Sequence, residues 1–158
     1  MTETHSGGCQ CGAVRYRVGG PLGNAGFCHC RMCQKAFGSF GAPLVSAAID
    51  RLTWTRGTPS EFRSSPIVAR GFCSACGTPL YMLEDGWTVY ELAIGSLDDP
   101  SAVAPSHVAG VESKLPWADR LPSLPGHSTV QDRTPEDLAK LATLQHPDHD
   151  TTEWPPRR

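Results

Sequence analysis

Seven cysteines, arranged in three short groups, are the residues of this sequence best suited to chemistry. The groups are Cys9 and Cys11, then Cys28, Cys30 and Cys33, and finally Cys73 and Cys76. An odd number of cysteines fits a disulfide framework poorly, and the polar first eight residues lack the apolar stretch of a secretory signal. In a reducing compartment, closely spaced thiols indicate metal binding, so we expect a cytoplasmic zinc protein.

The two cysteine pairs have the spacing of one closed zinc site. Zinc favours four ligands in a tetrahedron, and a site made of four thiolates is usually structural. A glycine directly follows each pair, which lets the backbone turn tightly beside a metal. We therefore expect one zinc ion to join two distant segments through the four-cysteine group, which consists of Cys9, Cys11, Cys73 and Cys76.

Cys28, Cys30 and Cys33 form a denser set, the three-cysteine group. Three protein ligands with an open fourth position are typical of a catalytic zinc ion, and a thiol or a water molecule can complete such a site. A thiol that binds there loses its proton near neutral pH, and a thiolate is suited to reaction with an aldehyde carbonyl. His29 lies between two of these cysteines, where ligation of the same metal is awkward, so we expect it beside the metal or on the surface instead.

The sequence leaves other assignments of the cysteines open. Cys28 and Cys30 could complete a four-ligand set with Cys73 and Cys76, which would leave Cys33 to the first pair. An iron–sulfur cluster is a further alternative, because thiolates ligate both metals. We favour the first grouping because the second divides the compact three-cysteine group.

The segments that must position the cysteines have the pattern of short strands. Apolar and charged residues alternate over residues 12–18, which predicts a half-buried strand after a loose lead-in at residues 1–6. A metal-binding knuckle at 28–33 and a helical turn at 34–37 come next. Further strands are expected at 43–48, 52–56, 60–64, 67–72, 80–83, 87–94 and 108–111. Without repeated alternation of strands and helices, the sequence predicts a mainly β fold of compact antiparallel sheets.

Composition divides the chain near residue 126. Residues 1–126 carry all the cysteines and all the predicted strands, and we expect them to form one zinc-binding domain. Residues 127–158 are polar and form a C-terminal extension.

The extension contains one recognisable helix signal. Thr134 suits the N-cap, Pro135 suits the first helical position, and the acidic residues that follow favour the positive end of the helix dipole. We expect a short helix near residues 135–145, followed by a frayed tail in which His146 and His149 are solvated.

Charge and hydropathy argue against two functions, and several conspicuous residues have a structural explanation. The net charge of −2, without a basic stripe, argues against nucleic acid, and no apolar run is long enough to cross a membrane. Asp98 and Asp99 precede a proline, so we expect them to form a turn. Trp54, Trp87 and Trp117 are expected to be packing residues.

The cysteines stand within longer motifs that resemble those of one family. The motifs are Gly8–Gly12, Cys28–Cys33, Phe72–Leu80, Ile94–Pro100 and Lys114–Trp117. Together they resemble the glutathione-dependent formaldehyde-activating enzymes, which share their domain with the centromere protein V-like proteins. The resemblance runs from about residue 5 to residue 126 and includes all seven cysteines.

This resemblance implies a fold, two zinc ions and an activity. The fold would be of the β-tent type, with a structural zinc ion in the four-cysteine group and an exchangeable one in the three-cysteine group. The activity would be the condensation of formaldehyde with glutathione to S-hydroxymethylglutathione, the reverse of a carbon–sulfur lyase reaction. Glutathione carries two carboxylates, and Arg31 and Lys35 are the cations closest in sequence to the three-cysteine group.

Three hypotheses follow for function. The first is a zinc-dependent, carbon–sulfur lyase-like enzyme whose partners are a small thiol such as glutathione and a small aldehyde such as formaldehyde. The second is a non-catalytic module that binds another protein and whose two zinc ions are both structural. The third is a redox or zinc-buffering role for the dense thiolates.

Overall fold

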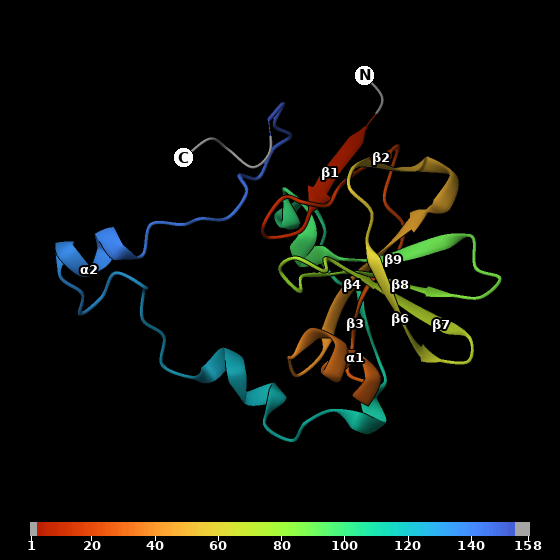
Figure 1. The fold of residues 1–158 in the computed structure, drawn as a ribbon. Coiled ribbons are helices and arrows are strands. Elements are labelled where there is room, and N and C mark those ends of the chain that lie inside the picture. The colour runs from red at the N-terminus through yellow and green to blue at the C-terminus, as the bar shows by residue number, and fades with distance from the viewer. Residues whose placement is uncertain (1–2, 154–158) are drawn as a thin grey trace.

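The structure, a computed structural model, describes residues 3–153, and its strands form two sheets (Figure 1). The smaller sheet has the order β1-β2-β5, and the larger has the order β10-β3-β4-β9-β8-β7-β6. Neighbouring strands run antiparallel, apart from the parallel pair β10 and β3. The strands are β1 Thr4–Gly8, β2 Arg15–Gly19, β3 Ala25–Cys28, β4 Ala42–Ala48, β5 Leu52–Arg56, β6 Ser60–Ser65, β7 Val68–Phe72, β8 Pro79–Glu84, β9 Val89–Ala93 and β10 His107–Ala109.

The two sheets share one hydrophobic core. Along β2, Tyr16 and Val18 are fully buried whereas Arg17 between them is exposed, the two-residue period of a strand with one face inside. Leu80 and Leu92 of the larger sheet are also fully buried and belong to the same cluster. Each such aliphatic side chain contributes about 1.5–3 kcal/mol by its removal from water.

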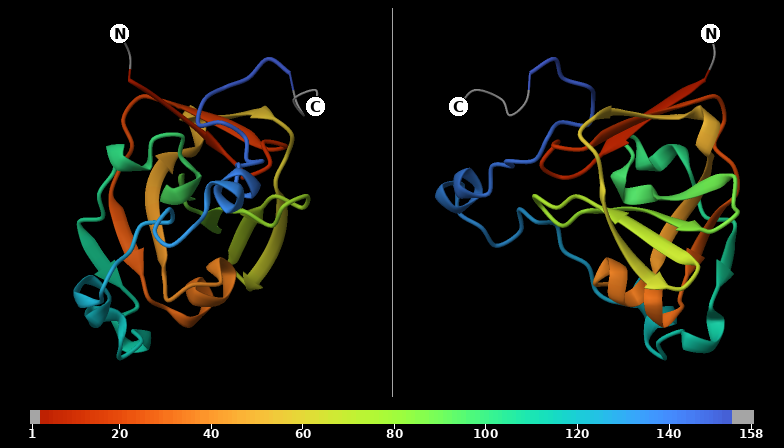
Figure 2. Two further views of the ribbon diagram at one scale, coloured as in Figure 1. Left: turned by 90° about the vertical axis from the view of Figure 1, so that its left-hand side faces the viewer. Right: turned by 45° about the vertical axis from the view of Figure 1, so that its right-hand side comes forward.

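The helices are short. The α-helices are α1 Arg31–Phe37 and α2 Pro135–Lys140. The 3₁₀ turns are η1 Ile49–Arg51, η2 Ile94–Ser96, η3 Pro100–Ala102, η4 Val111–Ser113 and η5 Ala118–Ser123. Both views of Figure 2 place α1 at the opposite end of the molecule from β1. Within residues 3–153, no helix has the length and apolar character needed to cross a membrane.

The predicted mainly β fold is confirmed, and β5 has the predicted limits. Two local predictions are wrong. Residues 4–6, part of the lead-in 1–6 that was expected to be loose, belong to β1, because the backbone of Thr4–Gly8 pairs with β2 even though the sequence is polar and glycine-rich. The knuckle expected at 28–33 instead comprises the end of β3, a short link and the start of α1. The dense cysteine spacing concealed the strand end and helix start at 28–33, whereas β1 was missed because its polar and glycine residues show no strand pattern.

The C-terminal segment also differs from expectation. Thr134 caps α2 and accepts a hydrogen bond from the backbone N–H of Asp137 at 3.2 Å, but the helix ends at Lys140. His146, expected to be solvated, is only 7% exposed, because its backbone N–H donates to the carbonyl of Gln10 at 2.9 Å and its ring packs near Gly12.

The segment after α2 therefore returns to the region beside β1 (Figure 1), whereas His149 is exposed as predicted. The final residues of the predicted frayed tail, 154–158, lie outside the described residues.

Candidate metal centres and the adjoining pocket

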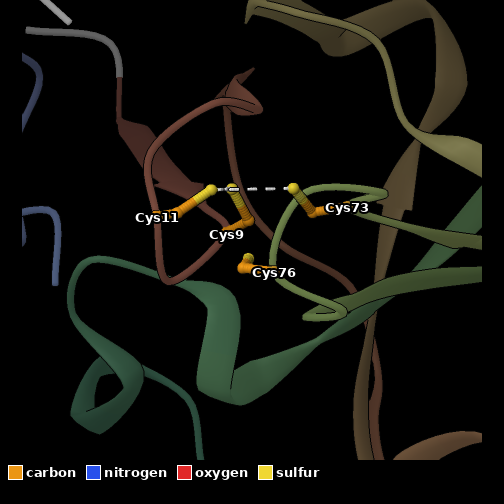
Figure 3. Close-up of side chains that lie close together, drawn as sticks. All are labelled: Cys9, Cys11, Cys73 and Cys76. Carbon is orange, nitrogen blue, oxygen red and sulfur yellow. Dashed lines mark hydrogen bonds between the residues drawn. The ribbon is translucent and has the colours of Figure 1, made fainter. Parts of the chain in front are cut away.

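Two loops bring the four-cysteine group together (Figure 3). Cys9 and Cys11 lie in the loop between β1 and β2, and Cys73 and Cys76 lie in the loop between β7 and β8. Their Sγ atoms all lie within 4.8 Å of one another. Residues far apart in sequence thus meet because the two loops lie where the smaller and larger sheets adjoin.

The sulfur–sulfur distances fit a zinc ion. The Sγ atom of Cys11 lies 3.6 Å from that of Cys9 and 3.8 Å from that of Cys73. Four sulfurs at about 2.3 Å from zinc form a tetrahedron with edges of roughly 3.8 Å. A disulfide would need a separation of about 2.05 Å, and the seven cysteines are all free. The group could therefore hold a tetrahedral metal ion.

Both loops are shaped for their sulfurs. Gly12 and Gly77 adopt φ values of +72° and +77°, where a side chain would be strained. The Sγ atom of Cys9 accepts a hydrogen bond from the backbone N–H of Val14 at 3.3 Å. Burial opposes ionisation of Cys76, but hydrogen bonds, chiefly with Thr78, outweigh it and lower its pKa to about 6. A thiolate already populated near neutral pH assists metal capture.

A buried ion pair stands beside this group. Arg15 donates to the two carboxylate oxygens of Asp98 at 2.7 and 2.6 Å, and Ser6 donates to the same carboxylate at 2.6 Å. Burial disfavours the charged form of Asp98, but these hydrogen bonds hold its pKa below the ordinary value. The expectation that Asp98 forms a turn is therefore incomplete. Asp99 does have that role, since it accepts the backbone N–H of Ser101 at 3.0 Å.

The C-terminal segment reaches the same ion pair. Asp150 accepts from Arg15 at 2.8 Å and from Arg17 at 2.6 Å, and Arg56 donates to Thr151. Residues 146–151 of this segment thus bind side chains of β2 and β5 and contact the loop that carries the first cysteine pair.

The three-cysteine group is built around the start of α1. Cys28 ends β3, Cys30 is the N-cap residue, and Cys33 lies in the first turn. Their Sγ atoms also lie within 4.8 Å of one another, and no fourth cysteine, histidine, aspartate or glutamate of residues 3–153 joins them. The Sγ atom of Cys30 accepts the backbone N–H of Cys33 at 3.4 Å. These residues fit a metal ion that has three protein ligands.

The thiols of this group differ in acidity when no metal is bound. Burial raises the pKa of Cys33 to about 12, although hydrogen bonds from Arg70 oppose the increase. Burial also acts on Cys30, but there hydrogen bonds to the backbone and to the other thiols outweigh it and lower the pKa. A metal ion must therefore displace a proton from Cys33, whereas Cys30 is the more easily ionised ligand.

Arg70 of β7 lies against the group. Its two terminal guanidinium nitrogens lie 3.6 Å from the Sγ atom of Cys33, and its Nε donates to Ser64 at 3.0 Å. The residue is only 7% exposed. A buried cation in this place offsets the negative charge that accumulates as thiolates gather around a metal.

A pocket of about 410 Å³ opens beside the three-cysteine group. It lies on one face of the larger sheet, and its lining includes all three cysteines, Arg70, Glu91 and His107. Trp87, which was expected to pack, is 40% exposed and lines this pocket. Trp54, by contrast, packs against Tyr16 and Tyr81 as expected. The three-cysteine group is thus accessible to a small molecule.

The other candidate residues lie around this group in different ways. His29 is buried, its Nδ1 has no hydrogen-bond partner in the described part of the chain, and it does not join the cysteines. Arg31 and Lys35 are exposed and line a neighbouring hollow that Arg70 also reaches. They remain candidate binding residues for an anionic group.

Sequence reasoning missed Arg70 and Glu91. Both occupy strands whose neighbouring residues are largely apolar, and both side chains lie on the pocket face of the sheet. A charged residue within an otherwise apolar strand was the available signal, because such a charge needs a partner or a ligand.

Comparisons with known proteins agree with this architecture. The sequence model of a family described as glutathione-dependent formaldehyde-activating enzyme matches residues 4–112. A crystal structure of a Rhodobacter sphaeroides protein, determined as a structural genomics target, is similar with a TM-score of 0.54 and 22% sequence identity. The similarity covers 66% of this chain and 99% of that protein. At that identity the similarity concerns the fold alone.

Proposed function

Because the chain belongs to the glutathione-dependent formaldehyde-activating enzyme family, we propose that it catalyses the reversible addition of glutathione, or a similar small thiol, to formaldehyde. The family supports a link with glutathione and formaldehyde in general. The finer proposal is that the carbon–sulfur bond forms and breaks at the three-cysteine group, as in a carbon–sulfur lyase.

The observation that carries this proposal is the contrast between the two cysteine groups. One offers four thiols and is complete, whereas the other offers only three. Both groups line pockets, of about 420 and 410 Å³, so the difference that matters is the open ligand position of the three-cysteine group. Three ligands with an open position are the arrangement of a catalytic zinc site. Zinc held by Cys28, Cys30 and Cys33 would supply Lewis acidity and stabilise the thiolate form of the incoming thiol.

The chemistry needs no oxidant and no further reactant. The sulfur of the thiol attacks the formaldehyde carbon, a carbon–sulfur bond forms, and the carbon–oxygen π bond breaks. The thiol proton is transferred to the carbonyl oxygen, which becomes the hydroxyl group of the product. The reverse direction restores thiol and aldehyde, so the reaction balances in both directions.

The residues of this chain would prepare the site for that reaction. Arg70 holds Cys33 and places a positive charge where thiolates accumulate. The first turn of α1 fixes Cys30 through the backbone N–H of Cys33. The pocket walls would hold the thiol near the cysteines, which replaces a collision between two dilute molecules by reaction within one complex.

Zinc stoichiometry tests the proposal directly. The purified wild type should bind two zinc ions, and Cys30→Ser should stay folded, bind one, and lose activity. Addition of glutathione should change the metal environment of the wild type alone, which cobalt substitution followed by absorption spectroscopy reports. A second metal that is indifferent to thiols would contradict the enzyme and favour a structural module that binds another protein.

A further inference from the structure

One row of side chains crosses the pocket face of the larger sheet. Ser46 of β4 pairs with Glu91 of β9, Glu91 pairs with Met82 of β8, and Met82 pairs with Arg70 of β7. Directly paired residues share a face of the sheet, so these four side chains lie side by side. All four line the pocket beside the three-cysteine group.

The row has opposite charges at two separate points. Arg70 lies beside Cys33, and Glu91 lies two strands away, which in a sheet is roughly 10 Å. Met82 separates them, so the two charges do not pair directly. A ligand whose sulfur lies near Cys33 would therefore extend its other end along the row toward Glu91.

Glu91 is a half-buried carboxylate that lacks a strong cation partner. Ser46 donates to its Oε1 at 2.6 Å, and no lysine or arginine of residues 3–153 forms an ion pair with it. Burial raises its pKa, while Ser46 and the nearby His107 oppose the increase. Partial burial of a carboxylate is costly unless a donor or a cation compensates for the lost water.

We propose that Glu91 binds the ammonium group of the thiol substrate, so that the pocket selects small thiols that carry a free amine. This inference rests on the proposed function, because it concerns the same pocket. The sulfur would lie at the three-cysteine group, near Arg70. The ammonium group would lie beside Glu91, two strands away along the row of four side chains. Glutathione has such an ammonium group several bonds away from its sulfur.

A second carboxylate in the pocket provides an internal comparison. Glu84 is also partly buried and lines the pocket, but it lies at the end of β8, next to the turn at Asp85 and Gly86. Glu91 lies between β4 and β8, in the interior of the sheet. The structure thus assigns the ammonium group to Glu91, and Glu84→Gln tests that assignment within the same pocket.

The experiment compares two ligands on zinc-loaded protein by titration calorimetry under reducing conditions. Glutathione carries the ammonium group, whereas N-acetylglutathione keeps the sulfur and the carboxylates but lacks the charge on nitrogen. The proteins are the wild type, Glu91→Gln, Glu84→Gln, and Glu136→Gln as a matched change on the exposed helix α2. Glu91→Gln should weaken glutathione binding about tenfold or more, the usual loss for a charge-assisted hydrogen bond, and leave the acetylated ligand unchanged.

The other outcomes overturn the inference in distinguishable ways. Equal weakening of both ligands by Glu91→Gln would mean general damage to the pocket, and no weakening would mean that Glu91 does not bind the ligand. Selective weakening by Glu84→Gln in place of Glu91→Gln would move the ammonium group to Glu84. If neither thiol binds the zinc-loaded wild type, the proposed function fails, and the assignment of Glu91 fails with it.

Discussion

The two cysteine groups use the same side chain but differ in their surroundings. The four-cysteine group joins two loops between the sheets and lies beside the C-terminal segment and the Arg15–Asp98 ion pair. The three-cysteine group is local, since one strand end and one helix start supply it, and it opens to a pocket. Because Cys9 and Cys76 also line a pocket, the number of ligands, more than access or ligand chemistry, separates a structural role from a reactive one.

Loss of one ligand should have opposite consequences in the two groups, and this is the largest effect we expect. Cys73→Ser removes a ligand that joins distant segments, so the protein should lose several kcal/mol of folding free energy and fold poorly or not at all. Cys30→Ser removes a ligand from a local group and should leave a cooperative thermal transition. Circular dichroism, with zinc analysis of the same samples, measures both. Comparable melting temperatures for the two variants would contradict the assignment of a structural group.

The fold was largely predictable because its strands carry a two-residue pattern, and the cysteine spacing was informative because chelating residues must lie close together. β1 and β3 were not predicted, since backbone pairing holds them and their glycines and polar residues carry no pattern. Burial of His146 was not predictable either, because it depends on a backbone contact with Gln10, far away in the sequence.

The same limit applies to the pocket. The spacing of its cysteines indicates a metal site, whereas Arg70 and Glu91 come to line the same pocket only through the register of β7, β8 and β9. Proximity in the sequence therefore favoured Arg31 and Lys35 as the cations that bind the substrate. They lie near the cysteines in the chain but are exposed outside this pocket.

The ion pair beside the four-cysteine group provides the second prediction. The side chains of Arg15 and Asp98 are 4% and 13% exposed, so Asp98→Ala would leave a buried arginine without its main partner and should cost about 3–5 kcal/mol at pH 7. Asp85→Ala breaks an ion pair with Arg63 in which both side chains are more than half exposed, and it should have far less effect on stability, because water screens such a pair. Urea denaturation of the zinc-loaded proteins measures both differences.

The pH dependence of this loss follows from the pKa of Asp98. Because that pKa lies below its ordinary value of 3.8 in the folded protein, the carboxylate stabilises the fold above that value. The stabilisation is lost as the pH falls through the folded-state pKa. The difference between the wild type and Asp98→Ala should therefore shrink below about pH 3.8, and a difference that stays constant in acid would argue against an ionic origin.

The smallest effect that we expect is on thiol affinity when Arg70 is replaced. It tests whether the positive charge beside Cys33 distinguishes the three-cysteine group. Arg70→Met removes the charge but keeps much of the apolar volume, so thiol affinity should fall about tenfold while both zinc ions remain bound. Arg70→Lys should restore part of the affinity, because it returns the charge without the planar pair of donors that faces Cys33. Titration calorimetry with glutathione and zinc analysis measure the two quantities separately.

Arg63→Met is the matched control, since Arg63 lies on the adjacent strand β6 but is exposed and pairs with Asp85. It should leave thiol affinity unchanged. If Arg70→Met lowers zinc content and affinity together, Arg70 acts by holding the cysteines in place. If affinity falls at full zinc content and lysine partly restores it, positive charge beside Cys33 is what allows a fourth, anionic thiolate to join three others. The four-cysteine group would then satisfy the same requirement differently, through hydrogen bonds such as those from Val14 and Thr78.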